Sequence, residues 1–187
     1  MTNRMFRKDP ICAFGLLLML SVSAADAQEP QTAHHRFRDT EHWAHIFESP
    51  ERARWQKPDQ VVSALNLKPG QTVVDIGAGT GYFTRRFART VGPSGKAIGL
   101  DIEPGMIDYM KANAKQLNLP NYEARLVQPD NPELAPRSVD VVFFCDVLHH
   151  IDERVAYLRK LEPGLKRGGR IVVIDFKKTA PSARLPR

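Results

Sequence analysis

Two kinds of apolar pattern alternate along the middle of the chain. Short apolar runs recur at strand length, and between them the apolar residues fall on one face of a helical period. Glycine, proline and asparagine mark most of the junctions, as is common where a chain turns. The predicted strands are residues 73–76, 96–101, 122–127, 138–145 and 171–176.

Helices are predicted before and between these strands, at 40–48, from Pro50, at 58–67, at 82–91, from Pro104 and from near Asp152. Regular alternation of strands and helices is typical of a parallel sheet with helices on its faces. The usual connections then favour the strand order 3-2-1-4-5. The sequence therefore predicts an α/β fold, a Rossmann-like doubly wound parallel sheet.

The first predicted strand leads into a turn with three glycines, Gly77, Gly79 and Gly81. Glycine adopts positive φ readily and lets a ligand lie against the backbone. The helix that follows offers free N–H groups and the positive end of its dipole. This arrangement predicts a site for an anionic or hydrogen-bond-accepting small molecule. A dinucleotide site would need glycine at position 82, where this chain has Tyr82.

From Asp75 to Gly81 the chain reads D-x-G-x-G-x-G, which resembles motif I of the class I S-adenosylmethionine-dependent methyltransferases. The segment 146–150 and the Gly168-Gly169 pair resemble later motifs of the same family, and the likeness covers roughly residues 56–178. The resemblance implies an enzyme that transfers a methyl group from S-adenosylmethionine. We expect a small-molecule acceptor, because the chain has no Asn/Asp-Pro-Pro-Tyr motif of the nucleobase enzymes.

Residues for the methyl donor are expected at the ends of the first three strands. Asp101 ends the second strand, where its carboxylate would stand beside the glycine turn and suit two ribose hydroxyls. The resembled family commonly has an Asp after the third strand for the adenine amino group, and this chain has Gln128 there, with Asp130 two residues on. The predicted donor-binding residues are Asp75, Gly77, Ala78, Gly79, Gly81, Asp101, Ile102, Gln128 and Asp130.

Candidates for catalysis follow the fourth strand. Methyl transfer from a sulfonium mainly requires alignment, and a general base is needed only when the acceptor loses a proton. Asp146, His149 and His150 are the predicted catalytic residues, although His150 also suits a cap on the next helix. Two alternatives stay open: a protein that binds S-adenosylmethionine or a nucleoside without turnover, and an inactive, truncated relative.

The first 27 residues resemble a secretory signal peptide. Basic residues precede an apolar segment at 11–22, which is too short for a comfortable membrane span, and Ala25-Asp26-Ala27 offers a cleavage site. We expect a periplasmic or secreted protein without a stable membrane span, or a cytoplasmic one if the leader is not functional. The expected organisation is a signal peptide at 1–27, a lead-in with helices at 28–57, a methyltransferase domain at 58–178 and a disordered tail at 179–187.

Composition narrows the range of other ligands. The formal charge is +6, without a dense basic run with interleaved aromatic residues, so nucleic-acid binding is not expected. His34, His35, His42 and His45 lie near one another in sequence, but a surface helix explains the last two and we predict no metal site. Cys145 is the only cysteine outside the predicted leader, which excludes an intramolecular disulfide in the mature chain.

The end of the chain is short for the resembled fold, which has seven strands. Only eleven residues follow Phe176, with two prolines and no alternating apolar run. The sequence therefore predicts a sheet lacking strands 6 and 7, and suggests a methyltransferase truncated at its C-terminus. The fifth strand would then be an exposed apolar edge, through which we expect possible self-association.

Overall fold

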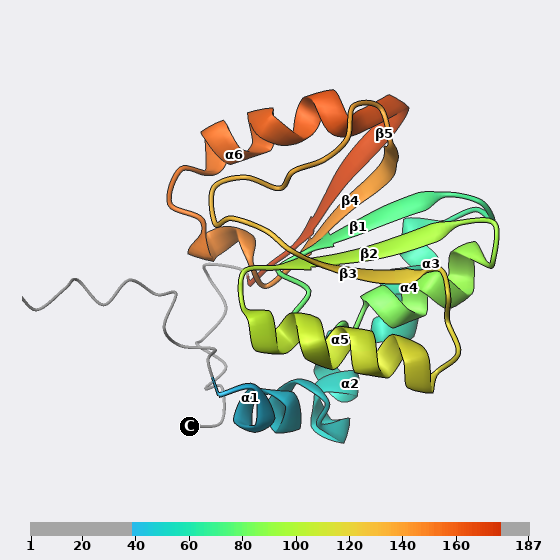
Figure 1. Ribbon diagram of the computed structural model, residues 1–187, viewed down its shortest axis with the longest axis vertical. Helices are drawn as coiled ribbons and strands as arrows, with labels where there is room; N and C mark the ends of the chain where they lie inside the picture. Colours follow the sequence, from blue (N-terminus) through green and yellow to red (C-terminus); the bar gives the residue numbers. More distant parts are fainter. Residues whose placement is uncertain (1–38, 177–187) are drawn as a thin grey trace, which may run out of the picture. The chain divides into compact units, whose positions relative to one another are not determined.

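A parallel sheet with helices on both faces forms the part of the chain that the computed structural model describes, residues 39–176 (Figure 1). The strands lie in the order β3-β2-β1-β4-β5, which confirms the predicted fold class and order. The predicted signal peptide and the tail at 179–187 lie outside the described residues. The strands are β1 (Thr72–Ile76), β2 (Lys96–Asp101), β3 (Tyr122–Leu126), β4 (Val139–Cys145) and β5 (Leu165–Ile174).

The helices follow the predicted alternation. In Figure 1, α4 and α5 lie on one side of the sheet and α6 lies on the other. No helix in residues 39–176 is long and apolar enough to cross a bilayer. The helical segments are α1 (Thr40–Phe47), α2 (Pro50–Gln56), α3 (Pro58–Leu65), α4 (Thr84–Val91), α5 (Pro104–Gln116), η2 (Leu148–His150), α6 (Arg154–Leu161) and η3 (Glu162–Gly164).

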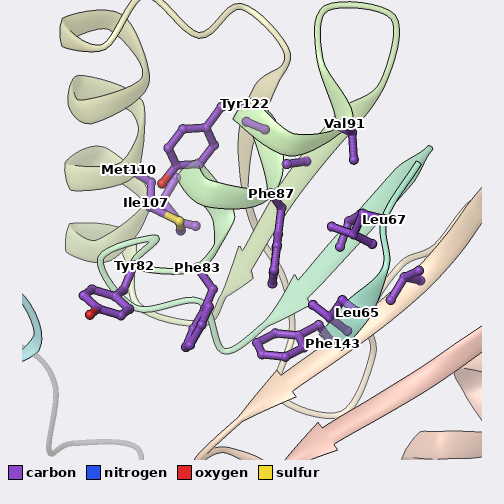
Figure 2. Packing of buried hydrophobic residues seen from close by; sticks show 14 residues of the cluster. Leu65, Leu67, Tyr82, Phe83, Phe87, Val91, Ile107, Met110, Tyr122 and Phe143 are labelled. Atoms are coloured by element: carbon purple, nitrogen blue, oxygen red, sulfur yellow. The ribbon is translucent and has the colours of Figure 1, made fainter. Parts of the chain in front are cut away.

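The central strands are apolar on both faces because each face is covered by helices. On one face, Phe143 of β4 packs against Phe83 and Phe87, with ring centroids 5.1 and 5.0 Å away (Figure 2). On the other face, Phe144 packs against Tyr157 of α6, at 6.3 Å between centroids. This packing on both sides fixes the carboxyl ends of β1 and β4, which carry the predicted site.

The turn predicted at Gly168-Gly169 before the fifth strand is wrong, because β5 already begins at Leu165 and contains both glycines. Val139 pairs with Leu165 and Val141 with Arg170, so the additional residues of β5 make an irregularity between these pairs. Gly168 has a φ of 80°. Since side chains with a Cβ rarely adopt this conformation, the glycine allows a bend within the strand.

Two helices begin later than predicted. α4 begins at Thr84, so Tyr82 and Phe83 still belong to the glycine turn. After β4, the chain first makes the short 3-10 turn η2, and α6 begins only at Arg154. The longer connections at both places leave more backbone at the carboxyl edge of the sheet.

Candidate functional site

The glycine turn between β1 and α4 is packed against two other parts of the fold. Gly77, Gly79 and Gly81 have φ values of 64°, 55° and 75°. A Cβ on Gly77 would lie 2.6 Å from the side chain of Val147, and one on Gly81 would lie 1.7 Å from the Tyr122 hydroxyl. These two glycines are therefore required by close packing as well as by backbone conformation.

Asp101 stands at the tip of β2, directly beside this turn. Its Oδ2 accepts a hydrogen bond from the backbone N–H of Gly79 at 2.8 Å, and its Oδ1 accepts one from Glu103 N–H at 3.0 Å. Burial raises the pKa of the Asp101 carboxyl, and these backbone hydrogen bonds oppose that effect. The spacing in the sequence placed Asp101 correctly at the turn. The neighbouring Ile102 packs into the core on the α6 side.

Asp75 lies beneath the turn. Its carboxylate accepts a hydrogen bond from Thr84 Oγ1 at 2.7 Å, and only 3% of the residue is exposed. Burial raises the pKa of Asp75 to about 7, while the Thr84 hydrogen bond and the charge of Arg52 act in the opposite direction. The visible role of Asp75 is to tie β1 to the first turn of α4.

The segment after β4 begins with a strained residue. Asp146 has a φ of 56°, and its backbone N–H donates to Ile174 O at 2.9 Å, which holds it beside the end of β5. Burial raises the pKa of Asp146. Burial, followed by the charge of Asp146, also raises the pKa of the Cys145 thiol, which accepts a hydrogen bond from Gln56 Nε2 at 3.1 Å. Cys145 is therefore a neutral thiol rather than a thiolate.

His149, one of the two predicted histidines, contacts an acidic side chain. Its Nδ1 lies 2.8 Å from Oδ1 of Asp175, just beyond the end of β5, and its ring lies 4.1 Å from that of His150. Asp175 was not predicted. It is an acidic residue at the end of an apolar strand, as Asp101 is, and this pattern in the sequence could have identified it.

Arg52 of α2 is a second residue that the sequence did not indicate. Its guanidinium lies 4.2 Å from the centroid of the Tyr82 ring and donates to Phe47 O at 3.1 Å. Its positive charge partly offsets the rise in pKa that burial causes at Asp75 and Asp146. Arg52 thus supplies positive charge between the glycine turn and the segment after β4.

Gln128 and Asp130, the predicted adenine contacts, are exposed, unlike the buried Asp75 and Asp101. Val127 N–H donates to the backbone oxygen of Asp101 at 3.0 Å, so the loop that contains Gln128 starts beside the tip of β2. Gln128 is exposed, and the side chain of Asp130 is 82% exposed. The Asp130 carboxylate binds Lys160 of α6 at 3.0 Å, and this pairing lowers its pKa.

Within residues 39–176, no group of three or more histidine, cysteine or acidic side chains is arranged to hold a metal ion. His42 and His45 lie on α1, and His34 and His35 fall outside the described residues. The polar groups that the structure gathers are instead backbone N–H groups, carboxylates, one arginine and the histidine pair.

Known proteins share this arrangement of motif and fold. A family model described as a methyltransferase domain matches residues 67–185, more than half of the chain. The chain belongs to the class I S-adenosylmethionine-dependent methyltransferases. Enzymes of this family use S-adenosylmethionine as the methyl donor, so the predicted family and cofactor are confirmed.

Several methyltransferases are similar in sequence or structure. The chain is 30% identical over 175 residues to a ubiquinone/menaquinone biosynthesis C-methyltransferase of Ectopseudomonas mendocina, covering 82% of this chain and 67% of that protein. It is 34% identical over 115 residues to an arsenite methyltransferase of Halobacterium salinarum, covering 62% of this chain and 29% of that protein. A solved methyltransferase from Aquifex aeolicus matches with a TM-score of 0.69 and 27% identity, over 74% of this chain and 73% of that one. The chain thus spans only part of the length of these methyltransferases.

The glycine turn fits the methyl donor of this family chemically. The donor has ribose hydroxyls, which suit the buried carboxylate of Asp101 beside Gly79. It also has a carboxylate and a cationic sulfonium. The guanidinium of Arg52 lies over the ring of Tyr82 in the turn, and the charge of Arg52 also acts on the carboxylate of Asp146. A Cβ on Gly79 would lie 3.4 Å from the ring of Phe47, so α1 packs directly on this part of the turn.

Proposed function

We propose that this methyltransferase transfers the methyl group of S-adenosylmethionine to a small-molecule acceptor at the carboxyl edge of its sheet. The observation that carries the proposal is the contact of the glycine turn with two strand ends. Gly79 N–H donates to Asp101 at the end of β2, and Gly77 packs on Val147 just after β4. Ligands of open α/β sheets bind at such a place, outside the carboxyl ends of the strands.

Each group at the turn has a proposed task. Asp101 accepts hydrogen bonds from the ribose, and the backbone of residues 77–81 lies against the donor. Arg52 binds its carboxylate, because a guanidinium pairs well with a carboxylate. Ile102 contributes apolar contact, and Gln128 offers an amide to the adenine from the loop that starts beside Asp101.

The donor supplies an activated methyl group when it is bound, so the protein mainly has to orient the two reactants. Orientation alone contributes a large part of the rate in such reactions. The segment after β4, from Asp146 to His150, borders the turn through Val147 and is the proposed acceptor side. Half-buried groups there also help to exclude water from the reacting atoms.

The acceptor is proposed to be other than arsenite, the substrate in the name of the Halobacterium salinarum relative. Trivalent arsenic is a soft centre that prefers thiolate ligands. Among residues 39–176 the free cysteine is Cys145, and burial holds its thiol in the neutral form. An organic acceptor fits this site better.

Calorimetry with S-adenosylmethionine, followed by measurement of S-adenosylhomocysteine release with a pool of small metabolites, tests the proposal. Binding with release of product is the expected result. Binding without product for every acceptor would favour the alternative of a non-catalytic binding protein. Absence of binding to a folded protein would contradict the proposal as a whole.

We also propose that the chain is exported and that β5 mediates self-association. The first rests on the basic and apolar pattern of residues 1–27, and predicts that protein isolated from an exporting host begins at Gln28. Full-length protein in the cytosol would contradict export.

The proposal of self-association rests on the edge position of β5 in the described sheet.

A further inference from the structure

Four side chains gather at the neighbouring ends of β4 and β5: His149, Asp175, Phe176 and Trp55. Cys145 and Ile174 are paired in the sheet, so the residues that follow each strand leave it side by side. Trp55 reaches the same place from α2, because its ring stacks on that of Phe176, with centroids 6.4 Å apart and planes at 28°. The set includes residues far apart in sequence.

The contact between His149 and Asp175 selects one tautomer of the imidazole ring. Asp175 Oδ1 lies 2.8 Å from His149 Nδ1. A carboxylate at this distance requires a proton on Nδ1, which leaves Nε2 of the neutral ring with its lone pair. The carboxylate is itself held, since Asp175 Oδ1 also accepts from Phe176 N–H at 2.9 Å.

The backbone around His149 is fixed as well. The guanidinium of Arg154 donates to Leu148 O at 3.0 Å and to His149 O at 3.1 Å. Val147, two residues before His149, is the side chain that packs against Gly77. His149 lies in the short 3-10 turn η2, which follows Val147 directly, so we assign the imidazole to the acceptor side of the same site.

An apolar surface lies beside the histidine. Trp55 and Phe176 are 50% and 48% exposed, which is unusual for a stacked pair of large rings, and the Phe176 centroid lies 6.2 Å from that of His149. Trp55 also lines a cavity of about 460 Å³ between the helices α2 and α3 and one face of β5. Apolar residues make up much of its lining: Val61, Ala64, Leu65, Val172 and Ile174. Gln56, Lys57, Gln60 and Arg170 complete the lining, so Trp55 is the residue that this cavity shares with the surface beside His149.

We propose that the acceptor is an apolar phenol and that His149 removes its proton during methyl transfer. This inference rests on the proposed function and specifies its acceptor. The phenol oxygen forms a bond to the methyl carbon while the carbon–sulfur bond breaks, and that electron pair stays on sulfur. The phenol proton moves to Nε2 of His149, and the imidazolium is stabilised by the carboxylate of Asp175. The products are an aryl methyl ether and S-adenosylhomocysteine.

Other classes of acceptor gain less from a general base such as His149 with its partner Asp175. A thiophenol is largely ionised near neutral pH, and an aniline attacks through a lone pair that it already has. A phenol is mostly protonated and gains most from a base held within reach of its oxygen. In this scheme His149 is the catalytic residue and Asp175 is a positioning residue that acts through it.

The test compares phenol, aniline and thiophenol as acceptors for the full-length protein and its His149→Gln variant. For phenol we expect kcat to fall by about 10²–10⁴-fold, the usual contribution of a general base. For thiophenol we expect a change of less than about threefold, since no proton has to be removed. His45→Gln, at an exposed histidine of α1, is the matched control and should leave all three rates unchanged.

The positioning role of Asp175 is tested by the effect of its substitution on His149 as a base. Asp175→Asn should lower kcat for phenol with little change in KM, and should shift the acid limb of the pH–rate profile, while Asp175→Glu should restore part of the rate. If Asp175 had a purely structural role, its substitution would lower the rates for thiophenol and phenol equally. The pH–rate profile would then stay unshifted. Phe176→Ala should raise KM for all three acceptors without a matching loss in kcat.

Two results would overturn the inference. One is equal loss of phenol and thiophenol methylation in a folded His149→Gln protein, and the other is binding of S-adenosylmethionine without methylation of phenol by the wild type. Both leave the donor site intact. If S-adenosylmethionine does not bind at all, the proposed function fails first, and the inference fails with it.

Discussion

Burial divides the acidic residues of the predicted donor site into two kinds. Asp75 and Asp101 are 3% and 9% exposed, and burial raises the pKa of each. Asp130 is an exposed carboxylate whose pKa is lowered by its pairing with Lys160. A buried carboxylate with backbone partners can hold a ligand in a fixed position, whereas an exposed ion pair contributes little.

Replacing Asp101 should therefore weaken donor binding. Asp101→Ala is expected to reduce the affinity for S-adenosylmethionine by about 1.5–3 kcal/mol, the usual loss of hydrogen bonds to a charged group. Titration calorimetry measures the change, with circular dichroism as a check of folding. Asp130→Ala is the comparison, and for this exposed residue we expect less than about 0.5 kcal/mol. Unchanged affinity in a folded Asp101→Ala protein would rule out the ribose assignment.

Asp75 should make stability depend on pH near neutrality. Its pKa is raised to about 7 in the folded protein, so folding favours the protonated form. This contribution is complete below the ordinary aspartate pKa and is lost as the pH rises through about 7. The wild type should lose about 2 kcal/mol more than Asp75→Asn in free energy of unfolding between about pH 5 and pH 8. Urea unfolding across this range measures the difference, and parallel pH curves would contradict the prediction.

At the scale of the elements, α1 is held over the glycine turn by polar contacts. None of its residues is fully buried. Glu48, at its C-terminal end, accepts hydrogen bonds from Thr80 Oγ1 at 2.6 Å and from the guanidinium of Arg85. A Cβ on Gly79 would lie 3.4 Å from the ring of Phe47. The Glu48 carboxylate therefore ties the C-terminal end of α1 to the turn and to α4.

Removal of that carboxylate should loosen α1 before the sheet is affected. In Glu48→Ala, the amides of α1 are expected to exchange with deuterium faster, and the unfolding free energy should fall by about 1–3 kcal/mol because partly buried partners lose their acceptor. Hydrogen-exchange mass spectrometry resolves the helix from the strands. Glu51→Ala, at an exposed position of α2, is the matched control. Equal exchange in both variants would show that other contacts hold the helix.

At the scale of the whole described region, β5 is the feature that points beyond a single chain. It pairs only with β4, so its other edge has no strand partner within residues 39–176. Val173 and Phe176 are 42% and 48% exposed at this end of the sheet. An apolar edge strand favours pairing with another chain.

A charge on this edge should prevent that pairing. We expect the wild type to sediment as a concentration-dependent oligomer and Val173→Lys to sediment as a monomer, because lysine on an edge strand opposes edge-to-edge association. Val155→Lys carries the same substitution on α6, at a residue that is 66% exposed, and should behave like the wild type. A wild type that stays monomeric at every concentration would disprove self-association through β5.

Local sequence patterns were enough to predict the five strands, their order and the glycine turn, although β5 begins earlier and two helices begin later than predicted. Apolar runs such as those of β1 and β4 are buried on both faces, so their pattern alone indicates parallel strands. Asp101 could be placed at the turn because its position in the chain follows directly from one strand–helix–strand unit. These features depend on neighbouring residues, and local patterns are enough to predict them.

Which side chains meet at the carboxyl edge depends on the packing of distant segments. His149 and Asp175 are 26 residues apart in sequence, and Gln56 and Cys145 are 89 apart. The contact of His149 with Asp175 depends on the register of β4 with β5, which includes the irregularity near Gly168. The contact of Gln56 with Cys145 depends on the packing of α2. Burial, which sets the pKa of Asp75 and Asp101, is likewise a property of the assembled layers. No local pattern contains this information, because it arises from the distance between segments that fold together.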